Sequence, residues 1–179
     1  SAADPAAAFS VDAAGTVEVS KWRHAIINFP HPMLKQGLVI LDTPGLNAIG
    51  TEPELTLRLI PDAHVVVFVL AADAGVTKSD LELWRSHVGG GQRKGCIAVL
   101  NKVDGLWDPL KSEEEVENEV SRQIMTTAQV LDIDVERVYP VSAQKGLVAK
   151  VSHDHELLAK SRLLELESVL SDQLIPQRR

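Results

Sequence analysis

Three short apolar runs and a weaker fourth constrain what this 179-residue chain can fold into more than any other feature. They lie at residues 37–41 (GLVIL), 64–70 (HVVVFVL), 95–100 (GCIAVL) and 137–141 (RVYPV). Runs of this kind, rich in β-branched residues, are typical of strands that are covered on both faces, as in a parallel sheet. Helical patterns separate them. Strands that alternate with helices predict an α/β fold with a doubly wound, mostly parallel sheet.

The helical patterns carry start signals. Residues 51–54 (TEPE) resemble a capping box with Pro in the first turn. Thr77 and Asp80 open the next helix, and Ser112, which precedes three glutamates, opens the longest one. A last, leucine-rich helix ends before Pro176. Each signal falls between two apolar runs or after the last one, as an alternating arrangement requires.

The beginning of the chain differs in composition from the rest. Residues 1–15 are rich in alanine and hold few large apolar side chains, so we expect a poorly ordered or boundary segment there. From Thr16 onward apolar residues fall near alternate positions, beginning with Val17 and Val19. We expect residues 16–179 to form one domain.

Composition excludes several classes of function. The net charge is −7 and no basic block stands out, so no binding to nucleic acid is expected. Aromatic residues make up 4% of the chain, which argues against stacking platforms for bases. The single Cys96 rules out a disulfide framework. No apolar stretch approaches the ~20 residues of a spanning helix, so we expect a soluble, cytoplasmic chain.

The first polar segment of interest, Asp42-Thr43-Pro44-Gly45, follows the first apolar run. Open α/β sheets bind ligands in loops at the carboxyl ends of their strands. An acid there can hold Mg²⁺ directly or through a water, and a nearby glycine can bring its backbone N–H against a terminal phosphate. Alone, the motif is also compatible with a purely structural turn.

The second segment, Asn101-Lys102-Val103-Asp104, follows the third run. A carboxylate such as that of Asp104 can accept two hydrogen bonds at once, and guanine offers adjacent N1–H and N2–H donors, whereas adenine does not. Lys102 can lay its methylene stem across a base. Asn101 is placed to tie neighbouring loops together. The alternative is a polar turn after a core strand.

The third segment, Ser142-Ala143-Gln144-Lys145-Gly146, follows the fourth run. Its backbone N–H groups could cover the guanine carbonyl, which requires no particular side chain. The order and spacing of the three segments place all three loops on the same edge of one sheet.

Together the DTPG, NKVD and SAQKG motifs resemble the third, fourth and fifth motifs of the translation-factor-type GTPases. Residues 37–50 (GLVILDTPGLNAIG) and the strand region 62–73 (DAHVVVFVLAAD) are most similar to the dynamin superfamily, particularly its bacterial dynamin-like members. The resemblance covers about residues 37–174. It implies a sheet of the P-loop GTPase type that binds GTP or GDP with Mg²⁺.

The resemblance also implies a role for each motif position. Asp42 would stand near Mg²⁺, through a water, and Gly45 would contact the γ-phosphate, with residues 46–50 as the mobile second switch. The base would be bound by Asn101, Lys102 and Asp104, and the loop closing over it would consist of Ser142, Ala143 and Gln144. No residue of this chain is assigned a catalytic role.

One family motif is missing. The phosphate-binding loop G-x-x-x-x-G-K-[ST] should precede DTPG and is absent from the sequence. The glycine-rich residues 89–95 (GGGQRKG) do not replace it, because they lie before a strand and lack Lys-Ser or Lys-Thr. We therefore expect residues 16–179 to be a truncated GTPase domain that lacks the first strand and the phosphate-binding loop, and this chain alone to be inactive.

Three functions remain open at this point. The first is the guanine-nucleotide-binding part of a dynamin-like GTPase, which when intact couples GTP hydrolysis to self-assembly or membrane remodelling. The second is a degenerate GTPase domain that acts as a non-catalytic interaction module. The third is an unrelated α/β domain with fortuitous motifs. For the first, the resemblance implies a cytoplasmic protein, peripheral at a membrane that it contacts through regions outside this chain.

The missing first strand has a structural consequence in the fold that the resemblance implies. That strand would lie between the strand ending at Asp42 and the strand ending near Ala71, so its absence leaves unpaired backbone groups. We expect direct pairing of the two flanking strands, insertion of residues 8–19, or pairing with a partner chain. Self-association is therefore expected.

Overall fold

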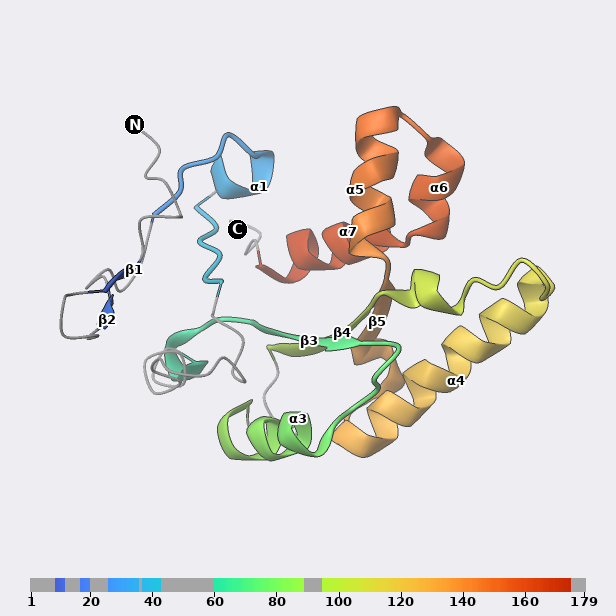
Figure 1. Cartoon of the computed structure of the whole chain (residues 1–179), viewed down its shortest axis with the longest axis horizontal. Coiled ribbons are helices and arrows are strands. Elements are labelled where there is room, and N and C mark those ends of the chain that lie inside the picture. Colours follow the sequence, from blue (N-terminus) through green and yellow to red (C-terminus); the bar gives the residue numbers. More distant parts are fainter. Residues whose placement is uncertain are drawn as a thin grey trace.

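The computed structural model describes residues 9–11, 17–19, 26–35, 37–42, 60–88 and 95–174, and Figure 1 shows the arrangement of their helices and strands. In chain order the strands and α-helices are β1 (Phe9–Val11), β2 (Val17–Val19), α1 (Pro32–Lys35), β3 (Val66–Ala71), α3 (Lys78–Leu83), β4 (Cys96–Asn101), α4 (Glu113–Leu131), β5 (Val138–Val141), α5 (Ala143–Ser152), α6 (His155–Lys160) and α7 (Leu163–Leu174). Short 3₁₀ turns lie at Ile60–Asp62, Val103–Leu106 and Val135–Arg137, and a π-helical turn, Trp84–Val88, extends α3.

The central sheet confirms three of the four predicted strands. Its order is β3-β4-β5, and both pairs are parallel. Asn101 at the end of β4 lies opposite Ala71 of β3 and Val141 of β5. The carboxyl ends of the three strands therefore meet at one edge, where the second and third motifs begin.

Helices cover both faces of this sheet. On one face, Leu100 of β4 packs in a core with Trp84, and with Leu131 at the end of α4. On the other face, Ile97 and Val99 form a second core with residues of β5 and α7. Figure 1 shows α3 and α4 on one side of the strands and α7 on the other. The doubly wound, parallel α/β fold predicted from the sequence is confirmed.

The predicted helix starts are present where the structure describes them. Ser112 caps α4: its hydroxyl accepts the Glu115 N–H at 3.2 Å, and the Glu115 carboxylate accepts the Ser112 N–H at 2.8 Å. Thr77 and Asp80 form the same reciprocal capping box at α3. Residues 51–54, the third predicted start, lie outside the described residues.

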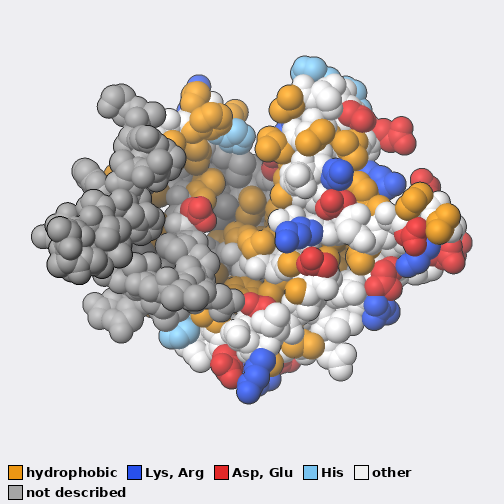
Figure 2. All heavy atoms as spheres, in the orientation of Figure 1, with side chains coloured by type: hydrophobic (Ala, Val, Ile, Leu, Met, Phe, Trp, Pro, Cys, Tyr) orange, Lys and Arg blue, Asp and Glu red, His pale blue; other side chains and the backbone are white. Residues whose placement is uncertain are grey.

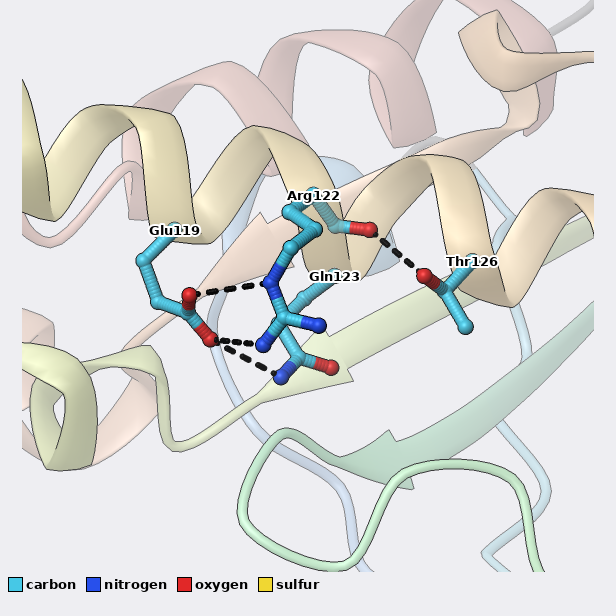
Figure 3. Close-up of polar contacts among 4 residues, drawn as sticks. All are labelled: Glu119, Arg122, Gln123 and Thr126. Atoms are coloured by element: carbon cyan, nitrogen blue, oxygen red, sulfur yellow. Dashed lines mark hydrogen bonds and ion pairs between the residues drawn. The ribbon is translucent and has the colours of Figure 1, made fainter.

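The longest helix, α4, carries a polar network on its solvent side (Figure 3). The Glu119 carboxylate accepts hydrogen bonds from Arg122 Nε at 3.0 Å and from Gln123 Nε2 at 3.2 Å. One turn on, the Thr126 hydroxyl donates to the Arg122 carbonyl at 2.8 Å. The hydrogen bonds from Arg122 and Gln123 lower the pKa of Glu119. The opposite side of the helix buries Val120 against the domain, so α4 is amphipathic as the sequence pattern predicted.

The first apolar run does not form the predicted strand. Residues 37–42 belong to neither sheet, and Val39, Ile40 and Leu41 are 86%, 71% and 57% exposed. A strand is stabilised by a neighbour that pairs with its backbone, and none of the described residues pairs with this run. The prediction of a strand at residues 37–41 is therefore wrong for this structure, because high β-propensity without a pairing partner is insufficient.

The N-terminal region holds a separate two-stranded sheet. β1 pairs with β2 in antiparallel register, with Phe9 opposite Val19. The sequence had predicted no element within residues 1–15, so β1 is an addition; the domain boundary after residue 15 stays a prediction. β1 and β2 pair with each other and not with β3. Among the described residues, neither intrachain route to covering the edge of β3 is realised.

No helix within the described part of the chain combines the length and apolar character needed to cross a membrane.

Candidate functional site

Two predicted loops come together at the carboxyl edge of the sheet. Asn101 is the last residue of β4, and Ser142 follows β5 directly. Because Asn101 lies opposite Val141, the sheet register places the two loops side by side. Immediately after β4, Lys102 adopts a left-handed conformation with φ of 66°, which is uncommon for a residue with a side chain. This residue turns the chain into the 3₁₀ turn that contains Asp104.

A hydrogen bond joins the two loops through side chains. The Ser142 hydroxyl donates to Oδ1 of Asp104 at 2.6 Å, and Ser142 is fully buried. Among the described residues no hydrogen bond reaches Oδ2 of Asp104, and Oδ1 retains a second lone pair. The carboxylate is half-buried and held on one side. It can therefore accept two further donors from a ligand.

Asn101 forms the second link between the loops. Its Oδ1 accepts the backbone N–H of Lys102 at 2.8 Å and the backbone N–H of Ala143 at 3.1 Å. One side-chain oxygen thus fixes the left-handed turn and the start of α5 together. The loop-tying role expected for Asn101 from the sequence matches this geometry.

The third motif forms the N-terminus of α5. Ser142 is its N-cap and accepts the Lys145 N–H at 3.4 Å. The sequence predicted that backbone N–H groups of Ser142, Ala143 and Gln144 would cover a guanine carbonyl. In this structure the Ala143 N–H donates to Asn101, and the Ser142 N–H donates to the Ser161 carbonyl at 2.9 Å. Gln144, exposed in the first helical turn, is the next donor by position.

The corner between α6 and α7 packs against the third motif. The sequence did not predict this contact. Ser161 is fully buried there and accepts the Ser142 N–H. A Cβ placed on Gly146 would lie 2.7 Å from Leu163 Cδ2 and 2.8 Å from Leu163 Cβ. Only glycine permits this approach. The glycine that closes SAQKG was the one signal in the sequence that pointed to close packing at this position.

Two tryptophans in the described part of the chain, Trp84 and Trp107, differ in their surroundings. Trp84 is fully buried in the core, and its indole N–H donates to the Leu131 carbonyl at 2.9 Å. Trp107 is half-buried beside the second motif, with Lys160 Nζ 4.9 Å from its ring centroid. Trp107 therefore belongs to the surroundings of the site.

Asp42 is the one residue of the first motif within the described part of the chain. Asp42 is exposed, and the segment that carries it lies outside the sheet, so the expectation that it ends a strand is wrong here. Gly45, the second-switch residues 46–50 and the glycines at 89–94 lie outside the described residues. No group of three or more His, Cys, Asp or Glu gathers within the described part. The roles of Asp42 and Gly45 stay predictions.

A parallel sheet covered by helices on both faces, with two linked polar loops at the carboxyl ends of adjacent strands, has the architecture of a P-loop GTPase-type domain. The family follows from the sequence comparison. Residues 9–103, more than half of the chain, match the family model described as the dynamin family, so the chain belongs to the dynamin family.

Two relatives agree with this assignment. The chain is 36% identical over 126 residues to the probable transmembrane GTPase FZO-like, chloroplastic, of Arabidopsis thaliana, which covers 69% of this chain and 13% of that protein. It is 26% identical over 94 residues to the bacterial dynamin-like protein of Nostoc punctiforme, which covers 52% of this chain and 13% of that protein. The chain thus spans about an eighth of either relative.

A solved structure agrees in fold. The LeoA bacterial dynamin GTPase from ETEC superposes with a TM-score of 0.51 and 19% sequence identity, over 69% of this chain and 24% of that one. At this level of identity the match supports the fold.

Proposed function

We propose that this chain supplies the guanine-recognition part of a dynamin-like GTPase that hydrolyses GTP to GDP and phosphate. The observation that carries the proposal is the Ser142–Asp104–Asn101 arrangement, in which one buried hydroxyl and one amide oxygen fix the second and third motifs to each other. Membership of the dynamin family supports the same function.

Base selection follows from the acceptor capacity of Asp104. Guanine presents N1–H and N2–H side by side, so two charge-assisted hydrogen bonds can form to one carboxylate. Each contributes about 1.5–3 kcal/mol, and about 1.4 kcal/mol corresponds to a factor of ten. Two such bonds therefore discriminate guanine from adenine by a few orders of magnitude. Lys102, exposed on its left-handed turn, lays its stem across the base.

Hydrolysis requires parts that the described residues do not provide. Phosphoryl transfer depends mainly on positioning and charge stabilisation around an in-line water, with Mg²⁺ neutralising phosphate charge when it is bound. We propose Asp42 as the residue that holds Mg²⁺ through a water and Gly45 as the γ-phosphate contact. We also propose that the phosphate-binding loop lies in a longer protein that contains this chain, which is termed the full-length protein below.

The cellular role proposed for the full-length protein is self-assembly or membrane remodelling coupled to GTP hydrolysis. Its support comes from the relatives, one named a transmembrane GTPase and one a bacterial dynamin-like protein. We place the protein in the cytoplasm or peripherally at a membrane, contacting lipid through regions outside this chain. Self-association of the chain is part of the proposal, and nucleic acid is not a proposed partner.

The test compares GTP and ATP in the full-length protein. Asp104→Ala removes both acceptors, so we expect the preference for GTP over ATP to fall by about tenfold or more. Asp172→Ala, at an exposed position of α7, is the matched control and should leave the preference intact. Measured GTP turnover separates a GTPase from a non-catalytic module that binds nucleotide without hydrolysing it. Unchanged discrimination in Asp104→Ala contradicts the assignment.

A further inference from the structure

Trp107 is contacted by a lysine from a distant helix. The tryptophan follows the 3₁₀ turn Val103–Leu106 that contains Asp104, and Lys160 is the last residue of α6. Lys160 Nζ lies over the indole ring, 4.9 Å from its centroid, within the range of cation–π attraction. The ring is half-buried and the lysine is exposed, so the contact lies at the surface of the molecule.

Short backbone contacts connect this pair to the recognition site. The Trp107 N–H donates to the carbonyl oxygen of Asp104 at 3.1 Å. Lys160 precedes Ser161, whose carbonyl accepts the Ser142 N–H at 2.9 Å. The cation–π contact therefore bridges two segments. One contains Asp104, the other accepts the N–H of Ser142, and these two residues are hydrogen-bonded to each other.

We propose that Lys160 is a positioning residue for guanine recognition, which acts by holding Trp107 and, through it, the turn that presents Asp104. This inference rests on the proposed function of Asp104. With the contact in place, the carboxylate is ordered before the ligand arrives, and less conformational freedom is lost on binding. Without it, the turn samples more conformations, and both hydrogen bonds to the base weaken.

A simpler role for Lys160, as a positive charge that attracts the phosphates, gives a different result. A free charge raises the affinity for GDP and for inosine diphosphate (IDP) equally, because the two ligands carry the same phosphates. A positioned carboxylate favours GDP over IDP. Inosine lacks the exocyclic amine of guanine and so makes one hydrogen bond to Asp104 where guanine makes two. The ratio of GDP affinity to IDP affinity therefore separates the two roles.

The experiment measures this ratio by calorimetry in the full-length protein. Lys160→Met keeps an apolar stem and removes the ammonium group, and we expect the ratio to fall about two- to fivefold. Lys160→Arg keeps a cation over the indole and should restore the ratio. Trp107→Leu should lower the ratio by a similar factor, and Lys160→Met should then add nothing, because the contact is already lost.

Controls separate positioning from a general loss of stability. Lys78→Met, at an exposed position of α3, should leave the ratio unchanged. If Trp107→Leu does not fold, Trp107→Phe serves in its place, since phenylalanine keeps a weaker aromatic face. An equal fall in GDP and IDP affinity, or a full Lys160→Met effect in the Trp107→Leu background, overturns the inference. A wild-type protein without preference for GDP over IDP overturns the proposed function as well.

Discussion

Ser142 and Asp104 are joined by a 2.6 Å hydrogen bond although 38 residues separate them in the chain. The serine caps α5 while the aspartate lies in the turn after β4, so the bond couples a helix start to a strand end. Since Ser142 is fully buried, its hydroxyl is directed at the carboxylate without competition from solvent. The two loops therefore behave as one recognition unit.

Removal of this hydroxyl should weaken guanine binding. Ser142→Ala leaves Asp104 without its intramolecular donor, and a hydrogen bond to a charged group contributes about 1.5–3 kcal/mol. We expect the affinity of the full-length protein for GDP to fall by about tenfold or more. Ser152→Ala is the control, because that hydroxyl donates to the Val148 carbonyl on an exposed part of α5. Fluorescent-nucleotide titration measures both variants, and equal affinities would refute the coupling.

Asp104→Asn should change the preferred base. Asparagine keeps one acceptor oxygen, which the Ser142 hydroxyl can orient, and replaces the other oxygen with an N–H donor. Xanthine carries a carbonyl where guanine carries its exocyclic amine. The new N–H donor of asparagine can therefore bond to the xanthine carbonyl, whereas in guanine it meets the N2–H group, which is also a donor. We expect affinity for GDP to fall and affinity for xanthosine diphosphate (XDP) to rise. Competition between the two nucleotides measures the change, and retention of GDP preference contradicts the assigned role.

This 179-residue chain on its own should bind GTP weakly. The base-recognition loops are present, but the sequence contains no G-x-x-x-x-G-K-[ST] loop to hold the phosphates. Calorimetric titration with GTP and Mg²⁺ should give weak binding or none, and hydrolysis should be absent. Submicromolar affinity would show that another segment of this chain holds the phosphates.

The capping box at Ser112 should make stability depend on pH in the acid range. Hydrogen bonds from the backbone N–H and hydroxyl of Ser112 lower the pKa of Glu115 below its ordinary value of 4.5. The folded pKa is depressed, so this contribution to stability is present above about pH 4.5 and is lost as pH falls through the lower folded pKa. We expect Glu115→Gln to flatten the acid limb of the unfolding free energy.

The control for this experiment is Glu113→Gln, which removes a carboxylate from the same helical turn but leaves the capping box intact. Urea unfolding at a series of pH values compares the two variants with the wild type. If both variants flatten the acid limb equally, the effect belongs to the helix dipole and not to the capping box.

The sequence predicted most of the fold because its strongest signals are local. The apolar runs that became β3, β4 and β5 each have a neighbour to pair with, and the caps at Thr77 and Ser112 depend on residues three positions away. The run at residues 37–41 has the same local signal and failed as a strand. Pairing depends on what lies beside a segment in space, and a single sequence window does not contain that information.

The candidate site was likewise predictable only in the part that depends on local signals and strand order. Asn101 ends β4, Asp104 lies in the turn after β4, and Ser142 follows β5. The order of strands in a parallel sheet was therefore enough to bring them together. Ser161 and Lys160 lie on the α6–α7 corner, and their contacts depend on how that corner packs under α5. Nothing in their local sequence distinguishes them from ordinary helix-end residues.

The edge of β3 that faces away from β4 leads to the last prediction, self-association. Within the described residues β3 pairs only with β4, and none of them pairs with its other edge, so we expect the backbone groups of that edge to accept a partner strand. Val67 and Val69 on this strand are 39% and 60% exposed, whereas their partners in the register, Ile97 and Val99, are buried in the core that includes α7. Figure 2 shows hydrophobic side chains exposed near the centre of the face that it draws. An edge of this kind recruits a strand from another chain.

We expect light scattering of the chain to show dimers or larger species whose population grows with concentration. Val69→Lys places a charge on the exposed strand, in the manner by which natural edge strands avoid pairing, and should shift the population toward monomer. Val151→Lys is the control: Val151 is 76% exposed on α5, away from the β3 edge, so its substitution should leave the association unchanged. A wild-type chain that stays monomeric at high concentration contradicts the prediction. Equal effects of the two substitutions would assign association to general surface hydrophobicity, because only pairing at β3 makes Val69 the more sensitive position.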